Sequence, residues 1–235
     1  AHVQAVFEIQ PYPSGLPRNI EQCLNDYNIP LYLSHTVTAI HGNERLTGVT
    51  ISRVDEHFKP IPGTEKEYSC DTLILSVGLI PENELSLDAG VTLDGRTKGA
   101  LVDEYFQTNV EGIFAAGNVL HVHDLVDFVS MEAEALADSA AEYIREGTLP
   151  DCPVEIRTDR NINHTVPQRV SGTRGFKLSM RVNRPIKECR IVVRQDGVEI
   201  AAKKMKKAIP AEMIQMTIDP DKLTAAGDLE VCVEC

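Results

Sequence analysis

The feature that most constrains this chain is a short apolar run that ends in a glycine and is soon followed by a long helical pattern. The run 113–116 predicts a strand, Gly117 ends it, and Asn118 comes next. Glycine lets the backbone approach a ligand closely, and a helix N-terminus offers free N–H groups and a partial positive charge. This segment is therefore suited to hold an electron-rich or anionic group.

The helix itself is predicted from about Asp124 to Glu146. Asp124 is a suitable N-cap and Gly147 a suitable C-terminal cap. Apolar residues recur at helical spacing along it, which predicts one apolar face: Leu125, Val129, Leu136, Ala140 and Ile144.

A second informative stretch lies upstream, at residues 70–83. It begins Cys-Asp, continues as the longest apolar run of the chain, and contains Gly78 and Pro81 before ending at Asn83. The run 72–81 has the pattern of a buried strand. It is much shorter than the roughly 18 apolar residues needed to span a bilayer, so no membrane span is predicted.

These two stretches resemble motifs of the pyridine nucleotide-disulfide oxidoreductases, in particular the thioredoxin-reductase-like branch. Residues 108–118, T-x-x-x-G-I-F-A-A-G-N, resemble the second flavin-binding motif. Residues 70–83 resemble the crossover where the last strand of the nicotinamide-binding domain returns to the flavin domain. The resemblance covers about residues 3–147, and the later part of the chain also resembles oxidoreductases associated with anaerobic glycerol-3-phosphate dehydrogenase.

The resemblance implies an FAD site. The family usually has Asp where this chain has Asn118, which can bond a ribityl hydroxyl but carries no charge. The next helix would offer backbone N–H groups of Leu125 and Val126 to the flavin pyrimidine edge, and Gly78 and Pro81 would mark the hinge between the nucleotide domains. The residues implied for this site and hinge are Gly78, Pro81, Gly117, Asn118, Val119, Asp124, Leu125 and Val126.

The resemblance also implies an NAD site. The opening apolar run ends at Glu8 and resembles the second strand of the nicotinamide-binding unit. Glu8 would then take the adenosine ribose hydroxyls. It would favour NAD over NADP, because a carboxylate repels a 2′-phosphate.

The expected fold is α/β, a truncated two-dinucleotide-binding-domain flavoprotein with Rossmann-like remnants, followed by a small all-β domain. Neither Gly-x-Gly-x-x-Gly fingerprint is present in the sequence. We therefore expect the chain to be the C-terminal part of a larger enzyme and to bind FAD weakly or not at all by itself. The expected domains are 1–82 (NAD-binding), 83–149 (FAD-binding) and 150–235 (antiparallel β).

Charge supports a boundary near residues 147–151. Residues 1–150 have a net charge of −15 and residues 151–235 one of +3, which together give the −12 of the chain. An acidic main body argues against nucleic acid as a partner. Six scattered cysteines are too few for a secreted disulfide scaffold, which favours a reducing cytoplasm.

The last third of the sequence has strand patterns. Residues 176–182 alternate, and Gln195-Asp196-Gly197 is a hairpin signal between the apolar runs 189–194 and 198–204. Further strands are expected at 213–218 and 229–233. The lysines at 203, 204, 206 and 207 are best explained as a solvated strand edge.

Two other patterns leave alternatives open. His121-x-His123 can ligate a metal, but no partner cluster is visible nearby in sequence, so a polar turn is favoured and no metal is assigned. A third interpretation is a proton donor near the flavin. Cys232-x-x-Cys235 is a redox or half-zinc signature, for which a coincidence at the chain end is favoured over half of a site shared with another subunit.

The intact protein is accordingly expected to move a hydride between NAD(H) and FAD and to pass electrons to an unidentified acceptor, substrate or partner subunit, with a homo-oligomer left open. The catalytic residues are unknown, and fold-level analogy does not fix the substrate. The competing class is a non-catalytic binding or assembly module whose basic β segment docks a partner subunit. A metallohydrolase built on His121 and His123 is a distant third hypothesis.

Overall fold

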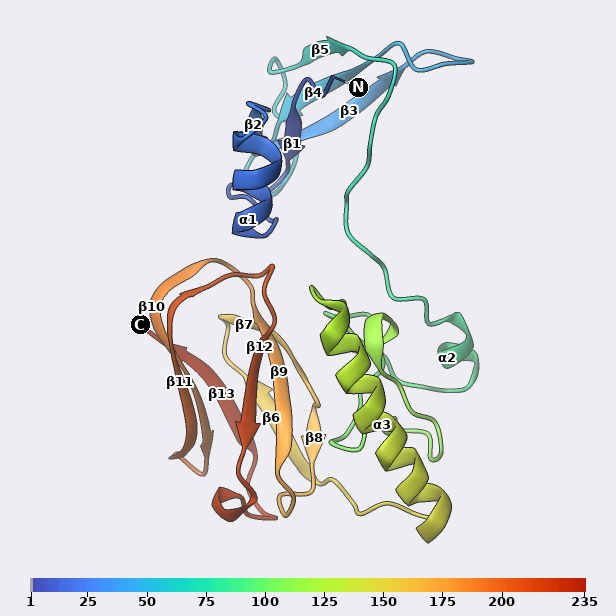
Figure 1. Ribbon diagram of the computed structural model, residues 1–235, viewed down its shortest axis with the longest axis vertical. Helices are drawn as coiled ribbons and strands as arrows, with labels where there is room; N and C mark the ends of the chain where they lie inside the picture. Colours follow the sequence, from blue (N-terminus) through green and yellow to red (C-terminus); the bar gives the residue numbers. More distant parts are fainter. Residues whose placement is uncertain (1) are drawn as a thin grey trace. The chain divides into compact units, whose positions relative to one another are not determined.

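The computed structural model describes residues 2–235 and divides the chain into two units (Figure 1). The first unit ends at Gly78 and the second begins at Leu79. The predicted domain limits at 82 and 149 stay predictions, and residues on both sides of 149 pack within the second unit.

The first unit begins with a small β-α-β element. Strands β1 (Val6–Glu8) and β2 (Leu31–Leu33) pair in parallel. Helix α1 (Pro17–Asn19), which continues as the π-helical turn η1 (Ile20–Asn25), lies between them in sequence. Pro17 suits the first helical position, where no intrahelical N–H is needed. This parallel pair with its helical connection is the Rossmann-like part of the fold.

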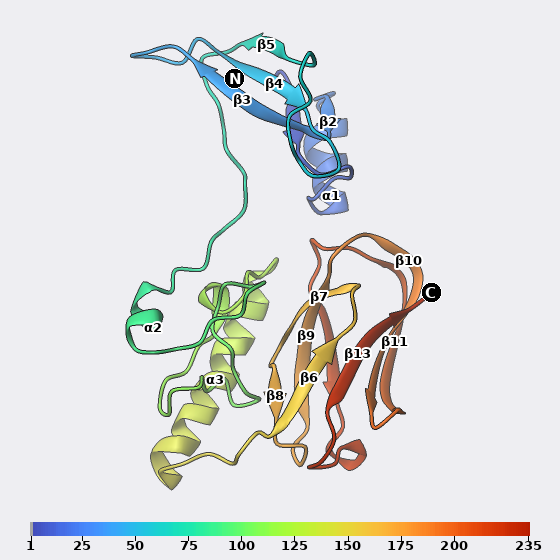
Figure 2. The ribbon, with the colours of Figure 1, turned by 180° about the vertical axis from the view of Figure 1, so that it is seen from behind.

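Three antiparallel strands complete this unit (Figure 2). They are β3 (His35–His41), β4 (Gly48–Arg53) and β5 (Lys66–Ser69), with β4 in the centre and almost wholly buried. The Phe7 ring lies 5.5 Å from that of Tyr32 and 5.0 Å from that of Tyr68. Aromatic packing of this kind joins the parallel pair to the antiparallel sheet.

The strand predicted over the apolar run 72–81 is wrong. Strand β5 ends at Ser69, and residues 70–83 form neither strand nor helix. Ile74 is 83% exposed and Val77 is 87% exposed. A strand needs a neighbour for its backbone N–H and C=O groups, and no segment within residues 2–235 pairs with this run.

The first part of the second unit is mostly irregular. It contains α2 (Glu84–Asp88) and the short 3₁₀ turn η2 (Gly117–Val119). The strand predicted at 113–116 is replaced by an isolated bridge between Gln107 and Phe114, and a second isolated bridge joins Leu93 and Ala100. The pairing stays local: the Thr108 N–H donates to the Ile113 carbonyl and the Ala115 N–H to the Phe106 carbonyl across a tight turn.

Helix α3 (Val126–Glu146) is the long helix that the sequence predicted. Gly147 ends it at φ +79°, and its N–H donates to the Tyr143 carbonyl at 2.8 Å. The predicted N-cap is wrong, because Leu125 occupies that position and Asp124 bonds elsewhere. The apolar face also differs at its ends, since Leu125 and Ile144 are exposed.

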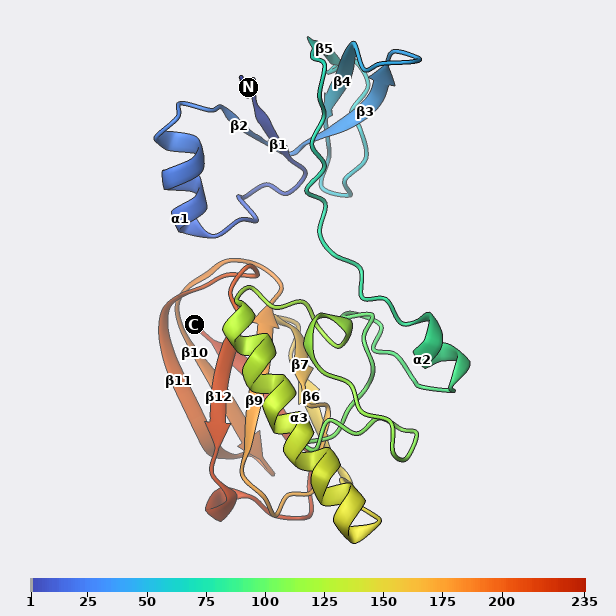
Figure 3. The same cartoon turned by 45° about the vertical axis from the view of Figure 1, so that its right-hand side comes forward.

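The rest of the second unit is a β-sandwich, beside which α3 lies (Figure 3). One sheet has the order β11-β10-β13-β6-β8 and the other β12-β9-β7. Their bounds, with the short turn η3, are β6 Val154–Thr158, β7 Ile162–Val166, β8 Arg169–Val170, β9 Phe176–Val182, β10 Ile186–Gln195, β11 Val198–Ala208, β12 Ile214–Ile218, η3 Pro220–Lys222 and β13 Leu229–Glu234.

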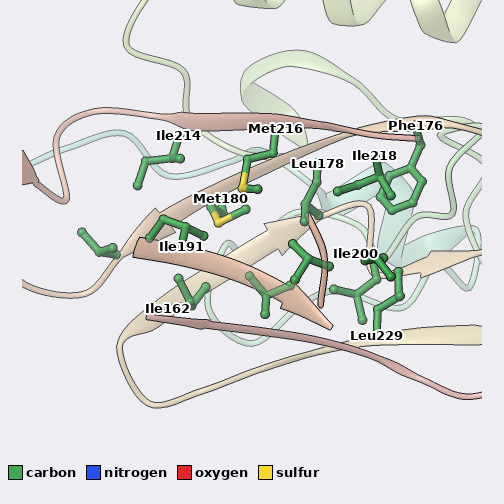
Figure 4. Packing of buried hydrophobic residues seen from close by; sticks show 14 of the residues in the cluster. Ile162, Phe176, Leu178, Met180, Ile191, Ile200, Ile214, Met216, Ile218 and Leu229 are labelled. Carbon is green, nitrogen blue, oxygen red and sulfur yellow. The ribbon is translucent and has the colours of Figure 1, made fainter. Parts of the chain in front are cut away.

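The core of the sandwich lies between the two sheets, where apolar side chains from both interdigitate (Figure 4). The alternation predicted along β9 is confirmed, because its even-numbered residues from Phe176 to Val182 are buried. The predicted hairpin at Asp196-Gly197 is also confirmed, with both residues at positive φ. The sandwich is not wholly antiparallel as predicted, since β6, the first strand, pairs in parallel with β13, the last.

The lysines of β11 lie on the edge strand of the larger sheet and are exposed, as predicted. The helices within residues 2–235 include none that is long and apolar enough to cross a membrane.

Candidate functional site

The turn at Gly117 begins the site. Gly117 is buried at φ +72°, a conformation that favours glycine. Its carbonyl accepts hydrogen bonds from the Leu120 and His121 N–H groups at 2.9 and 3.1 Å. The backbone thus doubles back sharply, and the residues that follow lead into α3.

Behind the turn lies a buried carboxylate, that of Glu132 in the second turn of α3. Its Oε1 accepts the Gly117 N–H at 2.6 Å, and its Oε2 lies 2.7 Å from Nε2 of His121. Nε2 of His123 lies 3.2 Å from Oε1. Burial alone would raise the pKa of Glu132, but the hydrogen bonds from the two imidazoles and from Gly117 lower it to about 2. The carboxylate is therefore ionised and fixes the turn.

The two histidines are themselves enclosed. The side chain of His121 is fully buried and that of His123 is 1% exposed. Their rings lie 4.4 Å apart, and the ring of His164 on β7 lies edge-on to His121 at 5.9 Å. Burial, followed by the proximity of His121 and Arg181, lowers the pKa of His164 to about 4, so its imidazole is neutral.

The sandwich holds the segment between the turn and α3. Arg181 on β9 donates to the Val122 carbonyl at 3.0 Å and to Oδ1 of Asp124 at 3.1 Å. The same carboxylate oxygen accepts the Met213 N–H at 3.3 Å. Burial lowers the pKa of Arg181, and Asp124 opposes that effect. Asp124 is thus a tether to the β-sandwich instead of the helix N-cap.

Asn83 connects the two motifs that the sequence singled out. Its buried amide NH₂ group donates to the Val119 carbonyl at 2.9 Å and to the Lys98 carbonyl at 3.0 Å. The end of the 70–83 stretch therefore lies directly against the turn of the 108–118 stretch. Pro81, just before it, is half-buried.

The outer side of the turn is open. Asn118 is exposed, and its Oδ1 accepts the His123 N–H at 3.0 Å. Leu125 is 40% exposed and Val126 is 75% exposed, so the N-terminal turn of α3 faces solvent. Free N–H groups of a helix N-terminus lie there beside the turn.

Glu8 and Gly78 belong to the first unit. Glu8 ends β1, and its carboxylate accepts the Gln10 N–H at 2.9 Å and a hydrogen bond from the Ser14 hydroxyl. The C-terminal end of a parallel strand is where nucleotides bind in such sheets. Gly78 is exposed at φ +91°.

A separate cavity of about 350 Å³ lies in the second unit, lined among others by Asp103, Glu111, Cys152 and Arg169. Burial and the nearby Asp103 raise the pKa of the Cys152 thiol to about 12, which makes it a poor nucleophile. At the chain end, Sγ of Cys232 accepts a hydrogen bond from Arg194 at 3.0 Å, whereas Cys235 is exposed.

Sequence reasoning missed Glu132, His164 and Arg181. Glu132 follows Val129 by three residues and precedes Leu136 by four, so it falls on the predicted apolar face, where a carboxylate is unusual. A glutamate on the apolar face of the helix was the sequence signal that could have identified Glu132 as a site residue. His164 and Arg181 come from strands distant in sequence, and β7 was not predicted at all.

A parallel β-α-β element, together with a glycine turn that leads into a helix N-terminus, defines a mixed α/β protein of the nucleotide-cofactor-binding class. Residues 3–141 match the family model of the pyridine nucleotide-disulphide oxidoreductases. The chain therefore belongs to that family, whose members are oxidoreductases that use FAD and NAD(P)H.

Comparisons with individual proteins support this family assignment. The chain is 26% identical over 116 residues to the ferredoxin reductase component of chlorobenzene dioxygenase from Cupriavidus sp. (strain PS12). The aligned region covers 46% of this chain and 28% of that protein. It is 29% identical over 125 residues to thioredoxin reductase from Treponema pallidum, which covers 53% of this chain and 38% of that one.

Among solved structures, thioredoxin reductase from T. acidophilum matches with a TM-score of 0.52 and 27% identity, over 60% of this chain and 44% of that one. The chain therefore spans less than half the length of these relatives.

Proposed function

We propose that this chain is part of an FAD-dependent oxidoreductase that transfers a hydride between NAD(H) and the flavin and passes electrons on to a further acceptor. The observation that carries this proposal is the Gly117 turn, whose N–H is fixed by Glu132 at 2.6 Å beside the exposed N-terminus of α3. FAD would supply the electron-accepting chemistry, and the chain would position it.

The residues of the turn suit this role. Gly117 permits close backbone approach, and Val119 is held by Asn83. Because Oδ1 of Asn118 accepts the His123 N–H, its amide NH₂ group is the part that would donate to a ribityl hydroxyl. The N–H groups of Leu125 and Val126 would face the polar edge of the flavin.

In the first unit, Glu8 would accept hydrogen bonds from the adenosine ribose of NAD(H). Its position at the end of β1, in a parallel pair, supports this assignment. A carboxylate there would repel the 2′-phosphate of NADP(H), which gives a preference for NAD(H). Gly78 and Pro81 would form the hinge between the nucleotide domains.

The chain by itself would bind FAD weakly, because it carries neither Gly-x-Gly-x-x-Gly phosphate loop. We place the intact enzyme in the cytoplasm, working with a partner oxidoreductase, of which the system associated with anaerobic glycerol-3-phosphate dehydrogenase is our candidate. The +3 charge of residues 151–235 is the feature that favours the alternative, an assembly module that docks an acidic partner without catalysis.

The test is to express the full reading frame that contains this chain and to measure bound flavin and its anaerobic reduction by NADH. The proposal expects about one FAD per chain and rapid bleaching of the flavin absorbance by NADH. A protein that carries no flavin and does not oxidise NADH would contradict this proposal and favour the assembly module. The isolated 235-residue chain serves as the control and should copurify with little FAD.

A further inference from the structure

We infer that His121, His123 and Glu132 form a binding site for one divalent transition-metal ion, with Zn²⁺ as the ion that this donor set favours. One ligand atom from each of the three residues lies within 4.8 Å of the others. Nε2 of His121 lies 2.7 Å from one Glu132 oxygen, and Nε2 of His123 lies 3.2 Å from the other. These are hydrogen-bond separations. An ion held about 2.0–2.1 Å from each donor would replace the shared protons and set the donors about 3.3 Å apart, a small change from the separations seen here.

The donor set itself points to a transition metal. Two imidazoles and one carboxylate are the ligands that Zn²⁺ takes in many open sites, and non-haem Fe²⁺ takes the same set. The chain geometry supports them well: the two histidines lie two residues apart on the extended segment before α3, and Glu132 projects from its second turn. The carboxylate is held in place by the Gly117 N–H at 2.6 Å, as an outer-shell bond orients a ligand.

Charge compensation is the second argument. The Glu132 side chain is 8% exposed, and the groups that contact its carboxyl oxygens are two imidazoles and a backbone N–H. A buried carboxylate needs a full positive charge nearby. Arg181 on the sandwich is paired with Asp124 and not with Glu132. A divalent ion coordinated by Glu132 and the two imidazoles would provide that charge.

Three unpartnered nitrogens mark where ordered water would surround the cluster. Nδ1 of His121, Nδ1 of His123 and Nε2 of His164 are all buried without a hydrogen-bond partner. Buried polar atoms of native proteins nearly always have one. These three nitrogens are not the Nε2 atoms of His121 and His123 that face Glu132, so they are positions for ordered water around the cluster and not for the ion itself. His164 also lines a small cavity of about 120 Å³, which is large enough to hold water.

The sequence favoured a polar turn at His121-x-His123 because no third ligand was visible. The structure supplies that ligand from a helix that begins three residues after His123. This inference does not depend on the flavin proposal, since the site is complete within the second unit.

The experiment is to strip the purified 235-residue chain with a chelator and to titrate it with Zn²⁺ against a chromophoric competitor, and separately with Co²⁺ as a spectroscopic probe. We expect one site per chain, a raised thermal midpoint with Zn²⁺, and a Co²⁺ spectrum with visible bands but no thiolate charge-transfer band. Glu132→Gln and His123→Gln should each weaken Zn²⁺ binding by about 100-fold or more, since each removes a direct ligand.

Two controls make the result specific. The double variant Cys232→Ser/Cys235→Ser removes the two free thiols near the chain end. His164→Gln removes a buried histidine outside the ligand set. Both variants should still bind Zn²⁺ as the wild type does. Circular dichroism checks that each variant is folded. The inference is overturned by a chain that takes up no stoichiometric Zn²⁺ or Co²⁺, by binding that survives Glu132→Gln, or by binding that the cysteine variant abolishes. If the ligand variants do not fold, the wild-type Co²⁺ spectrum decides alone: thiolate bands or no visible bands contradict the site.

Discussion

Glu132 and Gly117 are 15 residues apart in sequence, yet the glutamate carboxylate accepts the glycine N–H at 2.6 Å in the interior of the second unit. This bond anchors the turn at Gly117 to the helix that follows it. It also means that a single buried carboxylate serves the backbone of the turn and both histidines at once.

Replacing the Glu132 carboxylate should therefore lower the free energy of unfolding much more than replacing an exposed carboxylate on the same helix. Glu132→Leu leaves the Gly117 N–H and two imidazoles without a partner, and we expect it to lower the free energy of unfolding by about 3 kcal/mol. Glu134→Leu, on the exposed side of the same helix, should change it by less than about 0.5 kcal/mol. Chemical denaturation of both variants measures the difference, and equal effects would contradict the anchoring role.

The Arg181–Asp124 pair should behave as a partly buried tether. Both side chains are 13% exposed. Arg181→Met leaves Asp124 without its cation and should lower the free energy of unfolding by about 3–5 kcal/mol. Arg157→Met, which breaks an exposed pair with Asp228, should cost about 1 kcal/mol or less.

A double-variant cycle isolates this interaction. Arg181→Met/Asp124→Asn should be more stable than Arg181→Met alone, because no uncompensated carboxylate remains. Additive losses in the cycle would show that Arg181 acts only through its bonds to the Val122 and Pro210 carbonyls.

The Cys152 thiol should resist alkylation. Its pKa of about 12, raised by burial and by Asp103, lies well above the usual value of 9.0, so the thiolate fraction near neutrality is very small. A more basic thiolate is a stronger nucleophile, which partly offsets its small fraction. Together the two effects predict alkylation roughly 30-fold slower than for a normal thiol at about pH 8. Mass spectrometry after brief iodoacetamide treatment compares it with the exposed Cys23. Equal labelling of the two native thiols would refute the prediction, and denatured protein is the control.

Glu8 should decide the nucleotide preference of the intact enzyme. Glu8→Arg removes the ribose acceptor and introduces a partner for a 2′-phosphate, so the ratio of kcat/KM for NADH to that for NADPH should fall by at least about 10-fold. Glu21→Arg, an exposed change of the same charge on η1, should leave the ratio unchanged. An unchanged ratio in Glu8→Arg would remove Glu8 from the site.

The local patterns predicted the secondary structure of the second unit well where a segment contains its own signals. The alternation of β9, the hairpin at Asp196-Gly197 and the cap at Gly147 depend on neighbours in sequence, and all three are confirmed. The predictions fail where a segment needs another strand to pair with before it can form a strand itself. The apolar run 72–81 has strand composition, but without a neighbouring strand it stays irregular.

The candidate site shows the same division. Gly117 and the helix after it are visible in the sequence because a turn and a helix are local features. Arg181 and His164 lie 57 and 43 residues from Asp124 and His121, respectively, and only the sandwich brings them there. Glu132 is an intermediate case. Its position in the helical repeat indicated that its side chain faces the interior, but the sequence did not show that it bonds to the Gly117 N–H and the two histidines.

The central claim is that the turn at Gly117 lies against the flavin in the intact enzyme, and the FAD content of two matched glycine variants tests it most directly. Gly117 and Gly147 have nearly the same backbone conformation, φ +72° and +79°. Alanine at either position therefore carries a similar strain of about 1–2 kcal/mol. In the full-length protein, Gly147→Ala should retain one FAD per chain, whereas Gly117→Ala, which places a methyl group at the turn, should bind FAD at least about 10-fold more weakly. Equal FAD affinity in the two variants would contradict the account.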